Sequence, residues 1–244
     1  MKLKPIITSL LSLDLYKLSM GQVIYSRYAD YNTTWAFKCR NKDVHFTPKM
    51  VEEVKEQIKH YCSLSFTEDE LEYIHNIGSK NGKKGWIHSS YVNYLRLWKP
   101  RFEDFEIDDN AEAGIRIRAK GTWLNTSMYE IPVLAIVNEV YFRMAHDYDK
   151  LLEVHKRNTD NKIKDLISGK YKIGAFSEFG LRRRLSEEAQ DYAVQELVKY
   201  NKDYKGSVCV GTSNVYLAKK YGITPVGTMA HEFLQCVGQG NPKH

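Results

Sequence analysis

Side chains that can carry out chemistry gather at three places in the second half of the sequence. The first place holds Phe179 and three consecutive arginines at 182–184, the second is the Gly-Thr-Ser-Asn turn at 211–214, and the third joins His231 to Glu232. An aromatic ring can stack on a planar ligand, and an arginine can pair with a carboxylate or a phosphate. A histidine can act as an acid, a base, a metal ligand or a nucleophile. The three places therefore favour a site for a small anionic ligand.

The position of His231 favours a catalytic role. A single histidine is more often structural than catalytic, but two features change this balance. The preceding turn, Gly227-Thr228, has backbone amides that can hold an anion. Glu232 can orient the imidazole, although adjacent side chains need not touch. We therefore expect His231 to take part in the reaction.

The arginines and the turn each have two interpretations. Because Arg182, Arg183 and Arg184 are consecutive, they cannot all point toward one ligand. We expect one or two to bind a carboxylate or phosphate, and the others to be solvated or paired with Glu178 and Glu187. The turn suits phosphate oxygens, but it is equally a good helix cap. A loop aromatic, likewise, can simply cover a core.

The elements that position these side chains alternate between strand and helix. Short apolar segments at 171–176, 207–210 and 223–226 predict strands that lead into the three places. Helices are expected from Ser186, as a cap, to about residue 200, and over 214–221. This alternation is typical of a parallel sheet or barrel. Because the carboxyl ends of parallel strands lie on one face, we expect the three places to meet there.

The part of the chain before this region has a different pattern. Alternating apolar residues at 33–39 and within 102–120 predict antiparallel strands. A capping box of Thr67 and Glu70 opens one helix, and Asp14 is a candidate N-cap for another. Further helices are predicted at 51–61, at 124–144 with Pro132 at its start, and at 155–170.

These patterns predict an α/β protein in two domains. Residues 1–121 are expected to form an N-terminal α+β domain, and residues 122–244 the first part of a βα barrel-like domain. An eight-stranded barrel needs about 250 residues by itself. We therefore expect the barrel to be truncated in this sequence.

Composition narrows the class of protein. The chain is 43% hydrophobic and 27% charged, as in an ordinary globular protein. No apolar run reaches the roughly 20 residues that span a bilayer, and the start does not indicate a signal peptide. The four cysteines form no Cys-x-x-Cys pair, which favours reduced thiols and a cytoplasmic location and disfavours a metal site.

The charge and the missing motifs exclude several functions. The net charge is +6, and its only dense cluster is the arginine run, which favours a small anionic ligand over nucleic acid. Neither a P-loop nor a Gly-x-Gly-x-x-Gly motif is present, which disfavours P-loop NTPases and nicotinamide-dependent dehydrogenases.

Six segments, taken in order, resemble the nicotinate phosphoribosyltransferase family. The resemblance covers about residues 13–235. The matching segments are Leu13-Asp14-Leu15-Tyr16-Lys17-Leu18-Ser19-Met20, Gly121-Thr122-Trp123-Leu124-Asn125-Thr126, residues 129–139, Glu178-Phe179-Gly180-Leu181-Arg182-Arg183-Arg184, Gly211-Thr212-Ser213-Asn214 and Gly227-Thr228-Met229-Ala230-His231-Glu232.

The resemblance implies a cytoplasmic enzyme of NAD salvage. It would join nicotinate to phosphoribosyl pyrophosphate, giving nicotinate mononucleotide and pyrophosphate, with coupled ATP hydrolysis. ATP would be a cosubstrate, with Mg²⁺, and no tightly bound cofactor, nucleic acid or membrane is implied. The active enzyme would be a homodimer with a shared active site.

The resemblance also implies roles for single residues. ATP would phosphorylate His231, with Glu232 beside it. Phe179 would stack on the pyridine ring, and Tyr16 would reach the ring from the other subunit. Ser213 would lie near the nicotinate carboxyl group, where nicotinamide-using relatives have an aspartate. Arg182 would complete the nicotinate site. The residues expected to bind phosphate groups are Arg183, Thr212, Asn214 and Thr228.

Two alternatives remain at this stage. Family members continue beyond the Ala-His-Glu motif through further strands and a glycine-rich phosphate loop, so the chain can be an inactive fragment that keeps part of the substrate site. The other alternative is a nicotinamide-using relative, which Ser213 disfavours because an aspartate there would repel a carboxylate.

Overall fold

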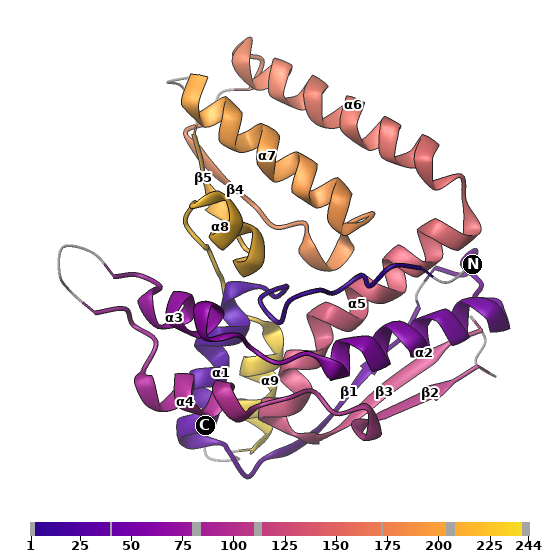
Figure 1. Cartoon of the computed structure of the whole chain (residues 1–244), viewed down its shortest axis with the longest axis vertical. Helices are drawn as coiled ribbons and strands as arrows, with labels where there is room; N and C mark the ends of the chain where they lie inside the picture. Colours follow the sequence, from indigo (N-terminus) through magenta and orange to yellow (C-terminus); the bar gives the residue numbers. More distant parts are fainter. Residues whose placement is uncertain are drawn as a thin grey trace.

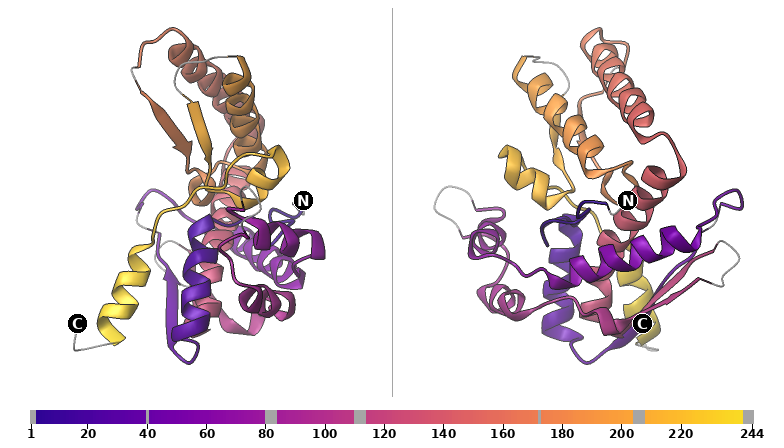
Figure 2. Two further views of the ribbon diagram at one scale, coloured as in Figure 1. Left: turned by 90° about the vertical axis from the view of Figure 1, so that its left-hand side faces the viewer. Right: turned by 45° about the vertical axis from the view of Figure 1, so that its right-hand side comes forward.

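A computed structural model gives the fold of the chain (Figure 1). It describes residues 3–39, 41–79, 84–109, 114–171, 173–203 and 208–240. Elements up to Ala145 fill the lower part of Figure 1, and elements from Tyr148 to Tyr221 fill the upper part. The last helix returns to the lower part, as both views of Figure 2 also show.

The lower part is an α+β unit with an antiparallel sheet. Its strands have the order β1-β3-β2 and pair antiparallel, which confirms the prediction for this region. Residues 110–113 of the predicted strand region lie outside the described residues. The elements are α1 (Leu15–Arg27), β1 (Asn32–Phe37), α2 (Pro48–Ser63), α3 (Glu68–Asn76), α4 (Ser89–Leu97), η1 (Phe102–Asp104), β2 (Phe105–Asp108), β3 (Arg116–Thr122) and α5 (Trp123–Ala145).

Caps were predicted from the sequence for the starts of α3 and α1, and the structure contains only the first. The capping box is confirmed, because Thr67 and Glu70 exchange side-chain and backbone hydrogen bonds of 2.8 and 3.2 Å. Asp14 does precede α1, but its side chain makes no cap bond. It accepts a hydrogen bond of 2.6 Å from Ser213 instead. A tertiary contact has replaced the expected cap.

Pro132 lies inside α5 and not at its start, which corrects the sequence prediction. Proline has no N–H, so the carbonyl four residues earlier, that of Met128, loses its helical donor. The Tyr61 hydroxyl of α2 donates to this oxygen at 3.4 Å. A neighbouring helix thus replaces the missing bond, and α5 continues to Ala145.

The upper part contains the predicted parallel strands in shortened form. Strands β4 and β5 pair parallel, which confirms that prediction. Residues 172 and 207 of the predicted strands lie outside the described residues. The elements are α6 (Tyr148–Ile167), β4 (Ala175–Glu178), η2 (Leu181–Arg183), α7 (Glu187–Asp203), β5 (Val208–Thr212), α8 (Val215–Tyr221) and, returning to the lower part, α9 (His231–Gly240).

The strand ends differ from the sequence prediction. Glu178 and Thr212 belong to strands and not to the loops after them. The third segment, 223–226, forms only a single parallel bridge, between Thr212 and Pro225. Proline cannot donate to a ladder, which limits pairing at this point. The helix that begins with His231 starts five residues after the segment ends. His231 therefore does not lie directly at the end of a strand.

Helix α5 joins the two parts. It packs on α1, α2 and the sheet, and also on η2 of the upper part. One cluster of buried side chains includes residues from Ile6 through Trp123 to Val215. The domain division expected at residue 121 stays a prediction. Helix α5 begins just after this point and packs both on elements before it and on η2, which follows it. Within the described ranges, no helix combines the length and apolarity needed to cross a bilayer.

Candidate active site

Four charged side chains form a continuous series of ion pairs. Arg182 Nη1 lies 3.2 Å from a Glu130 oxygen, and Lys17 Nζ lies 2.7 Å from the other. Lys17 Nζ is also 2.7 Å from Glu232 Oε2. Burial alone would raise the pKa of Glu130, but Lys17 and Arg182 bring it below its usual value. Residues of η2, α5, α1 and α9 therefore meet through charge.

Tyr16 lies beside this series in its own chain. Its side chain is buried, with 5% exposed. Burial, followed by the carboxylates of Glu130 and Asp14, raises the pKa of its hydroxyl far above the usual value. Burial also raises the pKa of Asp14, against the effect of its bond from Ser213. Tyr16 thus packs among residues of its own chain, and its expected contact with a nicotinate ring in another subunit stays a prediction.

Several expected ligand-binding side chains are open to solvent. The Phe179 ring is 49% exposed, and the Arg182 side chain is 42% exposed. Arg183, Thr228 and His231 are also exposed. The described residues offer no polar partner to the His231 imidazole. Exposure leaves these groups accessible from solvent, and their ligand roles stay predictions.

The carboxylate of Glu232 does not orient His231. One oxygen pairs with Lys17, and the other accepts a hydrogen bond of 2.8 Å from the Trp123 indole. The turn before His231 packs closely on the start of α1. A Cβ atom added at Gly227 would lie only 3.1 Å from the Tyr16 backbone nitrogen. The expected pairing of His231 with Glu232 is therefore wrong, and Lys17 holds the carboxylate instead.

The Gly-Thr-Ser-Asn turn is a helix cap in this structure. Asn214 accepts from the backbone nitrogens of Tyr216 and Leu217, at the start of α8. Thr212 donates to Glu178 at 2.5 Å, and Ser213 donates to Asp14. The side chains of the turn are therefore already occupied.

Burial also limits what the turn can offer a ligand. Thr212, Ser213 and Asn214 are fully buried. A buried hydroxyl or amide with its partners in place has little left to bind a ligand. That Thr212 and Asn214 bind phosphate and that Ser213 lies near the nicotinate carboxyl group stay predictions.

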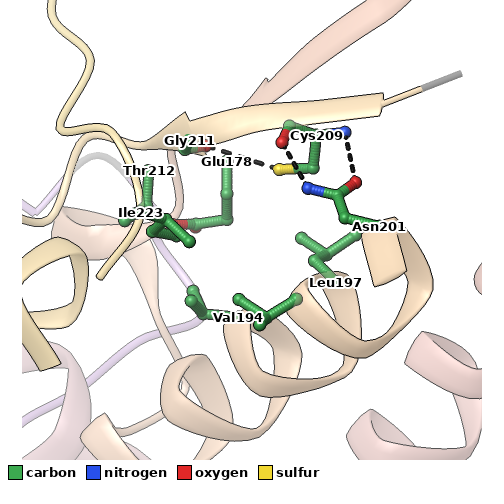
Figure 3. A pocket seen from close by; sticks show the side chains of 9 residues that line it. Glu178, Val194, Leu197, Asn201, Cys209, Gly211, Thr212 and Ile223 are labelled. Carbon is green, nitrogen blue, oxygen red and sulfur yellow. Dashed lines mark hydrogen bonds between the residues drawn. The ribbon is translucent and has the colours of Figure 1, made fainter. Parts of the chain in front are cut away.

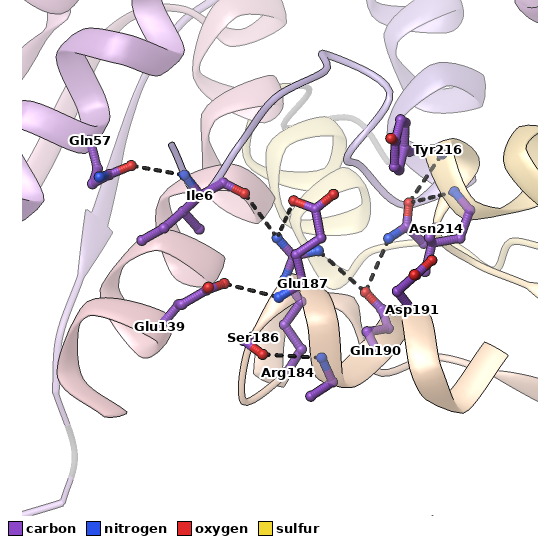
Figure 4. A network of polar contacts seen from close by, with 12 residues as sticks. Ile6, Gln57, Glu139, Arg184, Ser186, Glu187, Gln190, Asp191, Asn214 and Tyr216 are labelled. Carbon is purple, nitrogen blue, oxygen red and sulfur yellow. Dashed lines mark hydrogen bonds and ion pairs between the residues drawn. The ribbon is translucent and has the colours of Figure 1, made fainter. Parts of the chain in front are cut away.

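Arg184 is a structural residue of the network of polar contacts in Figure 4. It is buried, lies 3.7 Å from Glu187, and donates to the Ile6 carbonyl at 3.4 Å. Burial lowers the pKa of its guanidinium, while Glu187 acts in the opposite direction. Gln190 extends the network to the turn through Asn214, at 3.0 Å. The predicted pairing of an arginine with Glu187 is confirmed.

Glu178 lacks the other predicted arginine partner. Its carboxylate accepts from the Gly180 nitrogen, from Gln190 and from Thr212. Of the three consecutive arginines, only Arg182 and Arg183 thus remain for a ligand.

We expect Arg184→Ala to lower the free energy of unfolding by about 3 kcal/mol, because removing one member of a buried charged pair leaves its partner uncompensated. Arg183→Ala is the matched control, since that neighbour is exposed and should change stability by no more than about 0.5 kcal/mol. Urea unfolding of the two variants measures both values. Equal losses would show that Arg184 does not join the two parts.

A narrow hollow with essentially no room for a water molecule lies between α7 and β5 (Figure 3). Its lining includes Val194, Leu197 and Cys209. The Asn201 side chain bonds both the nitrogen and the oxygen of Cys209, at 2.8 and 2.6 Å. Because its polar groups are paired with one another, the hollow is a gap in packing and not a ligand site.

The sequence reasoning missed Lys17, Glu130 and Asp14 as site residues. Lys17 and Glu130 are charged residues within largely apolar helical segments. A charge on the buried side of a helix is costly unless it is paired, and this was the available signal. The pairing itself could not be read from positions 113 residues apart in the sequence.

Two family models match the chain. Residues 11–138 match the nicotinate phosphoribosyltransferase N-terminal domain, and residues 175–243 match the nicotinate phosphoribosyltransferase family. These matches, together with the mixed α/β fold, place the protein among the phosphoribosyltransferases. The chain belongs to the nicotinate phosphoribosyltransferase family.

Similar proteins carry the same family name. Nicotinate phosphoribosyltransferase of Ralstonia nicotianae is 37% identical over 98% of this chain, and that of Ralstonia pickettii is 36% identical over the same share. The chain spans about 58% of the length of these relatives.

Solved structures show the same similarity. A putative nicotinate phosphoribosyltransferase from Saccharomyces cerevisiae is 30% identical and has a TM-score of 0.81, over 100% of this chain and 59% of that one. The Porphyromonas gingivalis enzyme has a TM-score of 0.79 at 30% identity, over 96% of this chain and 56% of that one.

Proposed function

We propose that this chain carries the nicotinate and phosphohistidine residues of a nicotinate phosphoribosyltransferase. The reaction joins the ring nitrogen of nicotinate to C1 of phosphoribosyl pyrophosphate, and pyrophosphate leaves. The family membership supports this, and one observation of the structure carries it. The ion pairs from Arg182 through Glu130 and Lys17 to Glu232 connect the Phe179 loop to the start of the helix that begins with His231.

Phe179 and Arg182 are the groups best suited to nicotinate. The exposed Phe179 ring offers a face for stacking. Arg182 still presents part of its guanidinium to solvent and can pair with a carboxylate. A nicotinamide substrate would lack that charge. Because Ser213 is buried, the preference for nicotinate rests on Arg182 in this proposal.

ATP is the proposed phosphoryl donor to His231. A neutral imidazole nitrogen attacks the γ-phosphorus, the bond to the bridging oxygen breaks, and ADP leaves with the electron pair. The ring then loses its proton, and water later hydrolyses the phosphohistidine. Mg²⁺ on the ATP phosphates would offset their negative charge. Arg183 and Thr228 are exposed and can contact phosphate oxygens.

Phe179→Ala should raise the Michaelis constant for nicotinate about fivefold, since ring stacking contributes about 1 kcal/mol beyond burial. The Michaelis constant for ATP should change little. Ile167→Ala in α6 removes a side chain of similar exposure, 50%, away from these residues and serves as the control. Equal rises for nicotinate and ATP would make Phe179 a packing residue.

The function itself is tested by product formation. Purified protein should convert nicotinate, phosphoribosyl pyrophosphate and ATP into nicotinate mononucleotide, pyrophosphate and ADP, detected by chromatography. Nicotinamide in place of nicotinate is the test of the rival substrate. The cytoplasmic location and the homodimer stay predictions, and sedimentation of the active protein decides the second.

A further inference from the structure

Lys17 is a buried charge whose position needs an explanation. It lies in α1 between the apolar Leu15 and Leu18, and its side chain is 1% exposed. Taking an ammonium group out of water is costly unless other groups compensate the charge. Here Glu130 and Glu232 do so, each at 2.7 Å, from two different helices. An apolar residue would fill this space without that requirement.

The contact with Glu232 holds the first turn of α9. Glu232 is the second residue of that helix, directly after His231. Its two oxygens are fixed by Lys17 and by the Trp123 indole. Phe233 of α9 packs on Trp123, with their ring centroids 5.7 Å apart. The polar contacts of Glu232 thus tie the start of the helix to α1 and α5, in addition to the apolar packing of Phe233, Cys236 and Val237 against the core.

This anchor also determines what lies near the imidazole. With its carboxylate bound to Lys17, Glu232 presents no unpaired negative charge beside His231. A free carboxylate there would repel the phosphates of an approaching nucleotide. The same lysine binds Glu130, which in turn pairs with Arg182. Lys17 therefore connects the histidine and the arginine through two carboxylates.

We propose that Lys17 is a positioning residue that fixes His231 for phosphorylation by holding Glu232. The inference rests on the proposed function of His231. Because the Lys17 ammonium is buried and paired with two carboxylates, we assign it no direct contact with substrate. Its effect on the reaction passes through the start of α9.

The first test compares two activities of Lys17→Met, which keeps the length of the side chain and removes its charge. Phosphate transfer from labelled ATP to the protein should slow by about 10- to 100-fold, the range found when a group that orients a functional side chain is removed. Formation of mononucleotide without ATP should fall much less. Equal losses in both activities would overturn the proposal and make Lys17 a packing residue.

A double-mutant cycle tests the route. If Lys17 acts through Glu232, Lys17→Met with Glu232→Gln should be labelled no more slowly than Glu232→Gln alone. Additive losses would exclude that route. Glu232 is only partly buried, with 25% of its side chain exposed, so Glu232→Gln tests the same contact even if Lys17→Met fails to fold.

Hydrogen exchange tests the contact independently of catalysis. In Lys17→Met the amides of the first turn of α9 should exchange faster, while those of α2 keep their protection. Absence of label on the unsubstituted protein would reject the phosphohistidine, and hence the proposed function, without deciding about the anchor. In that case unchanged exchange in α9 overturns the role of Lys17, and faster exchange confined to α9 supports it.

Discussion

His231→Asn should abolish the transfer of labelled phosphate from ATP to the protein. The amide of asparagine is not a nucleophile under these conditions, and no other exposed imidazole lies in the motif. Synthesis of the mononucleotide without ATP should persist at a reduced rate, because glycosyl transfer needs no phosphohistidine. The measurement is acid-labile label on the protein after incubation with ATP.

His45→Asn is the matched control for this experiment. His45 is exposed like His231, but it lies before α2 and outside the proposed site. Its substitution should leave the label and the activity as they were. Label retained on His231→Asn, at the level of the unsubstituted protein, would exclude the phosphohistidine role.

Ser213→Asp should destabilise the fold by about 3 kcal/mol or more, and not simply change the choice of substrate. The Ser213 hydroxyl lies 2.6 Å from an Asp14 oxygen, and both side chains are buried. A second carboxylate in this place would face the first, and like charges at this distance cannot both ionise without cost. Urea unfolding at pH 7 measures the loss, and Ser213→Ala, which removes one hydrogen bond, should cost only about 1 to 2 kcal/mol.

The stability of Ser213→Asp should also depend on pH in a defined direction. In the folded variant the carboxyl pair has a raised pKa and binds more protons than the unfolded chain does. Its stability should therefore increase as the pH falls from 7 toward 5 and decrease as the pH rises. Native stability at pH 7 together with unchanged nicotinate kinetics would contradict the geometry found around Asp14.

The sequence correctly predicted those elements whose signals come from residues close together in the chain. The capping box at Thr67, the alternation of buried Ile117 with exposed Arg116 and Arg118 in β3, and the end of α8 at Tyr221, before Gly222 with its φ of 63°, all depend on residues within one turn or one strand. Pro132 was misplaced because its tolerance depends on Tyr61, 71 residues away in the chain. Local rules have no access to such a partner.

The site shows the same division. The residue types at Phe179, Arg182 and His231 could be recognised from the sequence, because a ring, a guanidinium and an imidazole each suggest their chemistry. The order of the motifs indicated the family, which the family models confirm. These properties belong to the residues themselves and to their order.

Only the tertiary structure decided which polar groups remain available to a ligand. By sequence, Ser213 and Asn214 suit a helix cap and a ligand site equally well, and the structure shows both side chains buried with partners in place. Lys17 and Glu130 became site residues because folding brings α1 and α5 together. A polar side chain binds whichever partner folding presents to it, and that partner can lie anywhere in the chain.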